Sequence, residues 1–371
     1  MQTDVIVIGA GTVGAAIAYG LVDRGLRVIV LDGSDTDHRA ARANFGLVWL
    51  QGKGVTMPEY HTLTRRSVDL WPGFHDQLTR LVGGWIDYER NGGLAFCLGE
   101  TAFDERRHEL QRLHTMLGGD PDWEMLDRAA LRKLLPKVEL GPEVAGASFG
   151  HHDGHVNPLK LLASLHEAVR RLGGTIRPNT PAQTITVQDG TFVVASGDER
   201  FEAGRVVVSA GLGSAVLARQ VGVEVPLRPQ RGQILVTERI EPLLPLPASG
   251  LRQTAEGTLM IGVTQEETGY DAGTTAEAAA RMSRDALRKV PRLGELRMVR
   301  QWAGLRVMTP DGFPVYAQSP SHPGAFVALC HSGVTLAGLH ADVVADAVAA
   351  GSLPASLDMF HPGRFDVPHA A

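Results

Sequence analysis

The sequence predicts an α/β fold that combines a parallel nucleotide-binding sheet with a second, mainly antiparallel sheet. The first observation is an N-terminal run of strand, glycine-rich turn, helix and strand over residues 5–8, 15–24 and 28–31. The second is a pair of strand-like runs at residues 234–237 and 259–263, which we expect to build a separate sheet. The length of 371 residues suits about two domains.

The glycine-rich turn carries the G-x-G-x-x-G pattern in the context that dinucleotide binding requires. Gly9 permits the tight turn, Gly11 lets the backbone approach a pyrophosphate, and Gly14 lets the helix pack on the strand. The N-terminus of the helix offers N–H groups and partial positive charge to phosphates. Asp32 can accept hydrogen bonds from ribose hydroxyls and would repel a 2′-phosphate. The turn by itself does not distinguish FAD from NAD.

The remaining elements of the first half follow from periodicity and turn residues. Residues 60–82 have helical spacing, and residues 85–96 alternate like a sheet around the turn at 91–93. Asn157 is a good N-cap with Pro158 at the first helical position, and the helix that follows ends at the two glycines 173–174. Its predicted apolar stripe consists of Leu159, Leu162, Leu165, Val169 and Leu172.

Further strands and helices are predicted in the second half. Residues 184–187 and 191–195 flank a hairpin turn, and the buried run 206–209 could return to the first sheet. Residues 276–290 are predicted to be helical. The chain is expected to close with a strand at 326–330 and a helix from about residue 335 to 349.

Composition excludes several classes of function. The formal net charge of −5 disfavours a nucleic-acid partner. The two cysteines, Cys97 and Cys330, suit a reducing compartment and exclude a disulfide framework or a four-thiolate iron–sulfur cluster. No apolar run reaches the roughly 18 residues of a membrane span, so we expect a cytoplasmic protein. The histidines at 151, 152 and 155 match no zinc pattern, and no metal is expected.

Seven motifs in fixed order resemble the D-amino-acid oxidase (DAO) family of FAD enzymes. They are IGAGTVG at 8–14, DGHVNP at 153–158, VVVSAGLGS at 206–214, RGQ at 231–233, LMIGVTQE at 259–266, WAGLRVMTPDGFPVY at 302–316 and LCHSGVTLAG at 329–338. Two segments, 43–54 and 329–337, are more narrowly similar to the flavin subunits of opine oxidases and of bacterial hydrogen cyanide synthase.

The resemblance implies a glutathione-reductase-like FAD domain formed by residues 1–84, 145–225 and 310–371, and a substrate domain formed by 85–144 and 226–309. It implies non-covalent FAD, because no cysteine stands among residues 304–308, shortly before the TPD motif. The residues expected to bind FAD are Gly9, Gly11, Thr12, Val13, Gly14, Asp32, Gly33, Ala43, Asn44, Phe45, Gly46, Ala210, Gly211, Gly304, Ser332, Gly333, Val334 and Thr335.

The implied reaction is oxidation of the C–N bond of an amino acid or opine-like secondary amine, giving an imine that hydrolyses. Because the chain shows no second redox site, we expect electrons to pass to partner subunits. The alternatives are an oxygen-using oxidase of glycine, sarcosine, proline or D-amino acids and a flavin-binding structural subunit. A flavoprotein that modifies tRNA is disfavoured by the acidic composition.

Three residues are candidates for catalysis. Arg306 is expected to hold a substrate carboxylate through its planar fork, with a salt bridge to Asp311 as the structural alternative. Arg252 is a weaker candidate for a second carboxylate. His331 stands in a turn whose N–H groups could face the flavin, and it could tune the amine. Lys53 is interpreted as an exposed loop lysine, with a place near the ring or at a subunit contact as the alternative.

Overall fold

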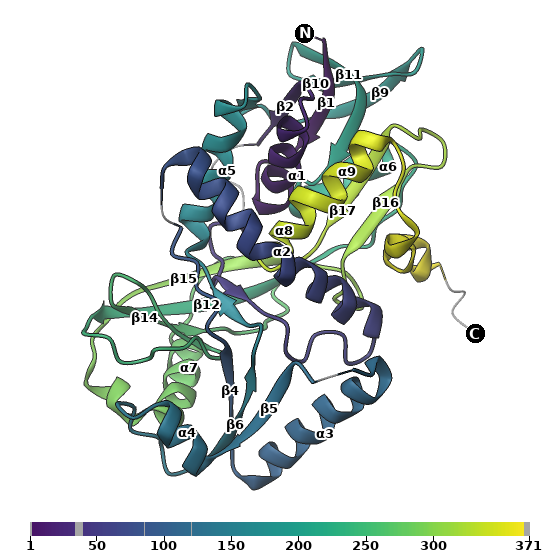
Figure 1. Cartoon of the computed structure of the whole chain (residues 1–371). Helices are drawn as coiled ribbons and strands as arrows, with labels where there is room; N and C mark the ends of the chain where they lie inside the picture. Colours follow the sequence, from purple (N-terminus) through teal and green to yellow (C-terminus); the bar gives the residue numbers. More distant parts are fainter. Residues whose placement is uncertain (1, 34–39, 85, 120, 367–371) are drawn as a thin grey trace.

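The computed structural model describes residues 2–33, 40–84, 86–119 and 121–366. An eight-stranded sheet forms the upper half of the molecule in Figure 1. Its main path runs β16 (Val315–Gln318), β17 (Ala325–Leu329), β11 (Glu199–Val208), β1 (Gln2–Ile8), β2 (Val28–Leu31) and β8 (Thr175–Arg177). The hairpin β9 (Thr184–Gln188) and β10 (Thr191–Ser196) extends from β11. All pairs along the main path are parallel except β16–β17.

Both faces of this sheet are buried, and strand β1 shows how. Val5 and Val7 pack against the helices α1 (Thr12–Asp23), α2 (Pro58–Val82) and α5 (Pro158–Arg171) and the C-terminal helical run. Ile6 and Ile8 face the β9–β10 hairpin and α6 (Ser214–Arg219). Because side chains alternate along a strand, a run of apolar residues such as 5–8 is typical of a parallel strand covered on both sides.

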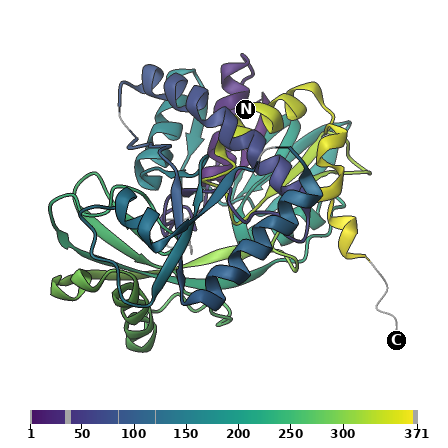
Figure 2. The ribbon, with the colours of Figure 1, turned by 60° about the horizontal axis from the view of Figure 1, so that its bottom comes forward.

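The lower half holds two smaller antiparallel sheets (Figures 1 and 2). One has the order β13 (Leu251–Gln253), β14 (Thr258–Gly262), β12 (Arg228–Arg239) and β15 (Met298–Met308). The other has the order β4 (Gly93–Leu98), β6 (Val144–Gly150) and β5 (Trp123–Asp127). The helices α3 (Glu100–Leu117), α4 (Arg128–Leu134) and α7 (Ala276–Lys289) accompany them. A shared core that includes Leu94, Leu235, Leu251 and Met282 joins both sheets.

Short elements complete the chain. A two-stranded ladder pairs β3 (Leu47–Val48) with β7 (Gly154–His155). Short 3-10 turns cover Gly211–Gly213, Pro291–Glu295, Ala355–Phe360 and Pro362–Phe365. The last long helical run comprises α8 (Ala337–Leu339), a π-helical turn at His340–Val344 and α9 (Ala345–Ala350). Gly351 then adopts a left-handed conformation that ends this run.

Most predicted elements are confirmed, including the hairpin at residues 184–195 and the return of strand 206–209 beside β1. Asn157 caps α5 by accepting hydrogen bonds from the N–H groups of Leu159 and Lys160. The sheet-like alternation predicted over residues 85–96 is confirmed only in its second half: β4 is a strand that pairs with β6, whereas before the turn Glu89 makes only an isolated bridge to His155. Residue 85 lies outside the described residues.

Two predicted details of the helices also need correction. In α5 the side chain of Leu159 is 54% exposed, while Leu161 takes a buried place beside Leu165 and Val169. The C-terminal helical run begins at Ala337 rather than at residue 335, because residues 333–336 form a turn first.

The division into two domains remains a prediction. Strand β6 pairs with β4 and β5, although the predicted boundary assigns residues 145–150 to the FAD domain. Among the described residues, no single helix is long and apolar enough to cross a membrane. One pair, Ala337–Ala350 with Ala355–Phe365, meets that criterion only when taken together, and it is bent by 110°.

Candidate cofactor and substrate site

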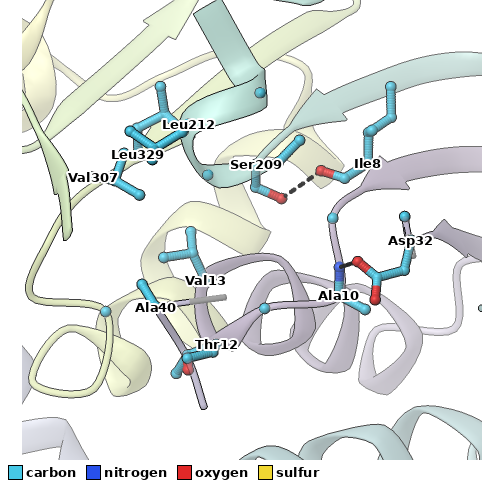
Figure 3. A pocket seen from close by; sticks show the side chains of 18 of the residues that line it. Ile8, Ala10, Thr12, Val13, Asp32, Ala40, Ser209, Leu212, Val307 and Leu329 are labelled. Atoms are coloured by element: carbon cyan, nitrogen blue, oxygen red, sulfur yellow. Dashed lines mark hydrogen bonds between the residues drawn. The ribbon is translucent and has the colours of Figure 1, made fainter. Parts of the chain in front are cut away.

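A first cavity of about 610 Å³ opens at the carboxyl ends of β1, β2 and β11, where ligands bind in parallel α/β sheets. Figure 3 shows Thr12 and Val13 on one side of it and Leu212, Val307 and Leu329 on the other. Its size suits a large organic cofactor. Eleven of the residues predicted to bind FAD line this cavity: Gly9, Gly11, Thr12, Val13, Asp32, Gly33, Asn44, Ala210, Gly211, Gly333 and Val334.

The glycines of the turn serve two purposes, close packing and an open cavity. A Cβ on Gly9 would stand 2.4 Å from the carbonyl oxygen of Ser209, and one on Gly14 would stand 1.9 Å from that of Gly9. A Cβ on Gly11, by contrast, would meet nothing closer than 3.9 Å, because Gly11 faces the cavity. Gly9 and Gly14 therefore allow the close packing of α1 on the sheet, and Gly11 leaves room for a pyrophosphate.

Asp32 stands where a ribose would be recognised. Its carboxylate accepts a hydrogen bond of 3.0 Å from the N–H of Ala10, which joins the end of β2 to the glycine turn (Figure 3). Ser209 ties β11 to the same turn, since its hydroxyl donates to the carbonyl of Ile8. The cavity, the glycines and this acid together fit the adenosine diphosphate part of FAD.

A second cavity of about 290 Å³ adjoins the first, and Ala40, Asn44, His331 and Val334 line both. The predicted FAD residues Ala43, Phe45, Gly304, Ser332 and Thr335 line the second cavity alone. Gly304 is needed here because a Cβ on it would stand 2.3 Å from that of Ala43. Among described residues, the N–H groups of Gly333, Val334 and Thr335 bond to no other residue. These N–H groups fit the electron-rich edge of a flavin.

Arg306 reaches the second cavity from strand β15. Its guanidinium lies over Gly232 of β12, where a Cβ would come within 2.6 Å of it. It makes two long hydrogen bonds of 3.4 Å, to the side chain of Gln230 and the carbonyl of Arg231. The predicted structural alternative is wrong, because Asp311 pairs with Arg364. Burial lowers the pKa of Arg306, against the opposing effect of Glu266.

His331 lies at the junction of the two cavities. Burial lowers its pKa to about 3, and the charges of Lys53 and Arg306 act in the same direction. Its Nε2 lies 3.2 Å from the hydroxyl of Ser332. His331 is therefore neutral at pH 7 and supplies no positive charge to a flavin or a substrate.

Arg252 lines neither cavity among the described residues. Its guanidinium is buried beside Met260 and His155, and its Nε has no hydrogen-bond partner. Burial lowers the pKa of Arg252 to about 10 and that of His155 to about 4. The loop at Gly46 covers Arg252, since a Cβ there would lie 3.3 Å from Nη2. Its predicted contact with a substrate therefore has no geometric support.

The histidine cluster beside Asp153 does not converge on a point. Asp153 is fully buried and accepts hydrogen bonds from the N–H groups of Leu50 and Gln51, whereas His152 turns to Asp122. Burial raises the pKa of Asp153 to about 7. Within the described part of the chain, no group of three His, Cys, Asp or Glu side chains could hold a metal ion.

Sequence reasoning missed part of the site. Lys53 is half-buried and lines the second cavity, so its interpretation as an exposed loop lysine is wrong. Gly232, which lines the second cavity, was not predicted as a site residue although it lies in the RGQ motif. Tyr270 lines the first cavity from a connecting segment that carried no signal in the sequence. Two predicted FAD residues, Gly14 and Gly46, line neither cavity and act through packing.

Comparison with known proteins places this site among flavoenzymes. The family described as "FAD dependent oxidoreductase" (DAO) matches residues 4–347. A chain of the opine oxidase of Agrobacterium tumefaciens (strain Ach5), named as one of that enzyme's subunits, is 40% identical over 371 residues, with 100% of this chain and 99% of the relative covered. Hydrogen cyanide synthase subunit HcnC of Pseudomonas protegens is 28% identical over 98% of this chain and 96% of its own length.

A solved structure agrees with these relatives. Glycine oxidase from Geobacillus kaustophilus superposes with a TM-score of 0.89 at 25% identity, covering 98% of this chain and 99% of that one. The likeness extends over both halves of the molecule, so it includes the antiparallel sheets that border the second cavity.

Proposed function

This chain belongs to the DAO family of FAD-dependent oxidoreductases, and from that premise we propose that it oxidises opine-like secondary amines in a complex with partner subunits. The relatives support the class of reaction, since the chain resembles an opine oxidase subunit along its whole length. Arg306 carries the proposal. It is a cation on the wall of the second cavity, which also holds predicted FAD residues, and it forms no ion pair with a described carboxylate.

The reaction removes two electrons from the substrate. FAD, when bound, would supply an acceptor for these electrons as a hydride from the Cα–H next to nitrogen, and the N–H proton would leave to water. A C=N double bond forms, water adds to it, and the C–N bond then breaks to give an oxo acid and an amine. None of the described residues that line the second cavity is Asp or Glu, so we assign no general base.

Residues of the chain position the substrate for this transfer. Arg306 would hold the carboxylate through two parallel hydrogen bonds, which fixes the direction of the Cα–H bond. Phe45, Leu47, Trp49 and Ile234 give the second cavity apolar walls that limit access of water. The turn at residues 333–336 would place N–H donors where negative charge develops on the flavin.

The proposed route for the electrons is transfer to partner subunits. The two relatives named above are both called subunits. A cytoplasmic location remains part of this proposal. A second candidate, an oxidase that passes electrons to oxygen, is favoured by the likeness to glycine oxidase. Rapid turnover of the isolated chain with oxygen, with full yield of hydrogen peroxide, would establish the second candidate.

An Arg306→Met variant tests the role of the substrate site. We expect the variant to keep its FAD and to lose about 10- to 100-fold in the affinity for amine substrates, because a charge-assisted bidentate contact is removed. The measurement is substrate-dependent reduction of the flavin without oxygen. Full activity of the variant in its complex would instead mean that this chain holds FAD only as a structural subunit.

A further inference from the structure

The second cavity is positively charged. Arg306 and Lys53 both line it, and no Asp or Glu does so among the described residues. His331 adds no charge at pH 7 because its pKa is lowered to about 3 by burial. Because both side chains line one cavity of about 290 Å³, a small molecule bound there lies near both cations. The lining therefore complements a small ligand with two negative groups.

The ammonium of Lys53 has polar but uncharged neighbours. It donates a hydrogen bond of 3.0 Å to the hydroxyl of Ser332 and lies 5.5 Å from the centre of the Tyr60 ring. Tyr60 donates to the same hydroxyl at 2.9 Å. No described carboxylate lies within 4.0 Å of Lys53. Since an ammonium has three donors, a ligand oxygen can still bind to it.

The turn that carries Lys53 is held in one conformation by buried polar contacts. The side chain of Gln51 donates to Asp153 at 2.7 Å and to the carbonyl of Gly93 at 2.9 Å, and it accepts from Ser148 at 2.6 Å. Gly52 and Gly54 flank Lys53 with φ of 74° and 77°. The lysine is thus presented by a rigid turn, unlike a lysine on a mobile loop.

Resting on the proposed function, we propose that Lys53 binds a second carboxylate of the substrate. Arg306 holds the carboxylate beside the reacting Cα–H, and Lys53 holds the one on the other side of the nitrogen. Preferred substrates are then secondary amines whose nitrogen links two carboxylate-bearing carbons. Lys53 takes the role that was predicted for Arg252, which is buried away from the cavity.

Binding of non-reactive ligands tests this assignment without turnover. Diglycolate has two carboxylates around an ether oxygen, and methoxyacetate has one. Calorimetry on the FAD-loaded protein should show that diglycolate binds about 10- to 100-fold more tightly. Lys53→Met should abolish this preference and leave the affinity for methoxyacetate unchanged. Lys53→Arg should keep most of the preference for diglycolate. Lys137→Met, which removes an exposed lysine, is the matched control.

Two results would overturn the assignment. If Lys53→Met weakens the binding of both ligands equally, the lysine supports the cavity as a whole. If Lys53→Met changes the affinity for neither ligand but shifts the flavin reduction potential, the lysine acts on the cofactor. The proposed function fails separately, when the wild-type complex oxidises no secondary amine; the two ether ligands would still report on Lys53 in that case.

Discussion

Replacing Gly232 by alanine tests whether the position of Arg306, and not only its charge, supports catalysis. The new Cβ would lie 2.6 Å from Nη2 and 2.8 Å from Cζ of Arg306, closer than the 3.4 Å of ordinary contact. The guanidinium would have to retreat by about 0.8 Å, and misplacement on the order of 1 Å can cost 100-fold in rate. The charge of the cavity would stay the same.

We expect kcat/KM for amine substrates to fall roughly 10- to 100-fold, equivalent to about 1.4 to 2.7 kcal/mol. The free energy of unfolding should change by less than about 0.5 kcal/mol, because the displaced atoms end a flexible side chain and alanine suits a strand better than glycine. The assay is flavin reduction without oxygen over a range of substrate concentrations, alongside urea unfolding.

Gly204→Ala is the matched control, since a Cβ at this strand glycine would meet nothing closer than 4.0 Å. In a protein that already carries Arg306→Met, Gly232→Ala should not lower kcat/KM further, because the guanidinium that the new Cβ displaces is absent. Wild-type kcat/KM in the single Gly232→Ala variant would refute the reasoning, as would equal losses in the presence and absence of Arg306.

Three further predictions concern FAD binding and stability. Asp32→Ala should weaken the binding of FAD about 10- to 100-fold, because a charged acceptor on the cavity wall is lost. Fluorescence titration of the apoprotein with FAD measures the Kd, and an unchanged Kd would contradict this prediction. Gly14→Ala should lower the free energy of unfolding by about 1–3 kcal/mol in urea, because its Cβ would overlap the backbone, whereas Gly11→Ala should leave stability unchanged. Burial lowers the pKa of His340 from 6.5 to about 3, so the folded state takes up its proton less readily than the unfolded state. Stability should therefore fall as pH drops from 6.5 toward 4, by up to about 1.4 kcal/mol per pH unit, and His340→Leu should reduce that slope.

The sequence predicted the parts of the fold that depend on neighbouring residues. The run from β1 to β2 joins strand, turn and helix within the first 31 residues, so its pattern is complete locally. The alternation over residues 85–96 did not reveal that the partner of β4 is β6, about 50 residues further along the chain. Alternation of residue types indicates a strand without indicating its partner.

The same limit applies to the site. The glycine motif and Asp32 could be placed because a turn and a strand end determine their geometry. The direction of Lys53 depends on contacts between Gln51 and Asp153, which are 102 residues apart. Whether Arg252 reaches the cavity depends on the loop at Gly46, which packs over it. Charge and spacing in the sequence carry no information on either contact.

The most direct test of the account is to mix the FAD-loaded protein, without oxygen, with a secondary amine that carries two carboxylates, such as N-(1-carboxyethyl)glycine. We expect the visible absorption of the oxidised flavin to disappear and to return slowly when air is admitted to the isolated chain. If this amine, other opines and amino acids all leave the absorption unchanged, even in the presence of the partner subunits, this chain does not oxidise amines.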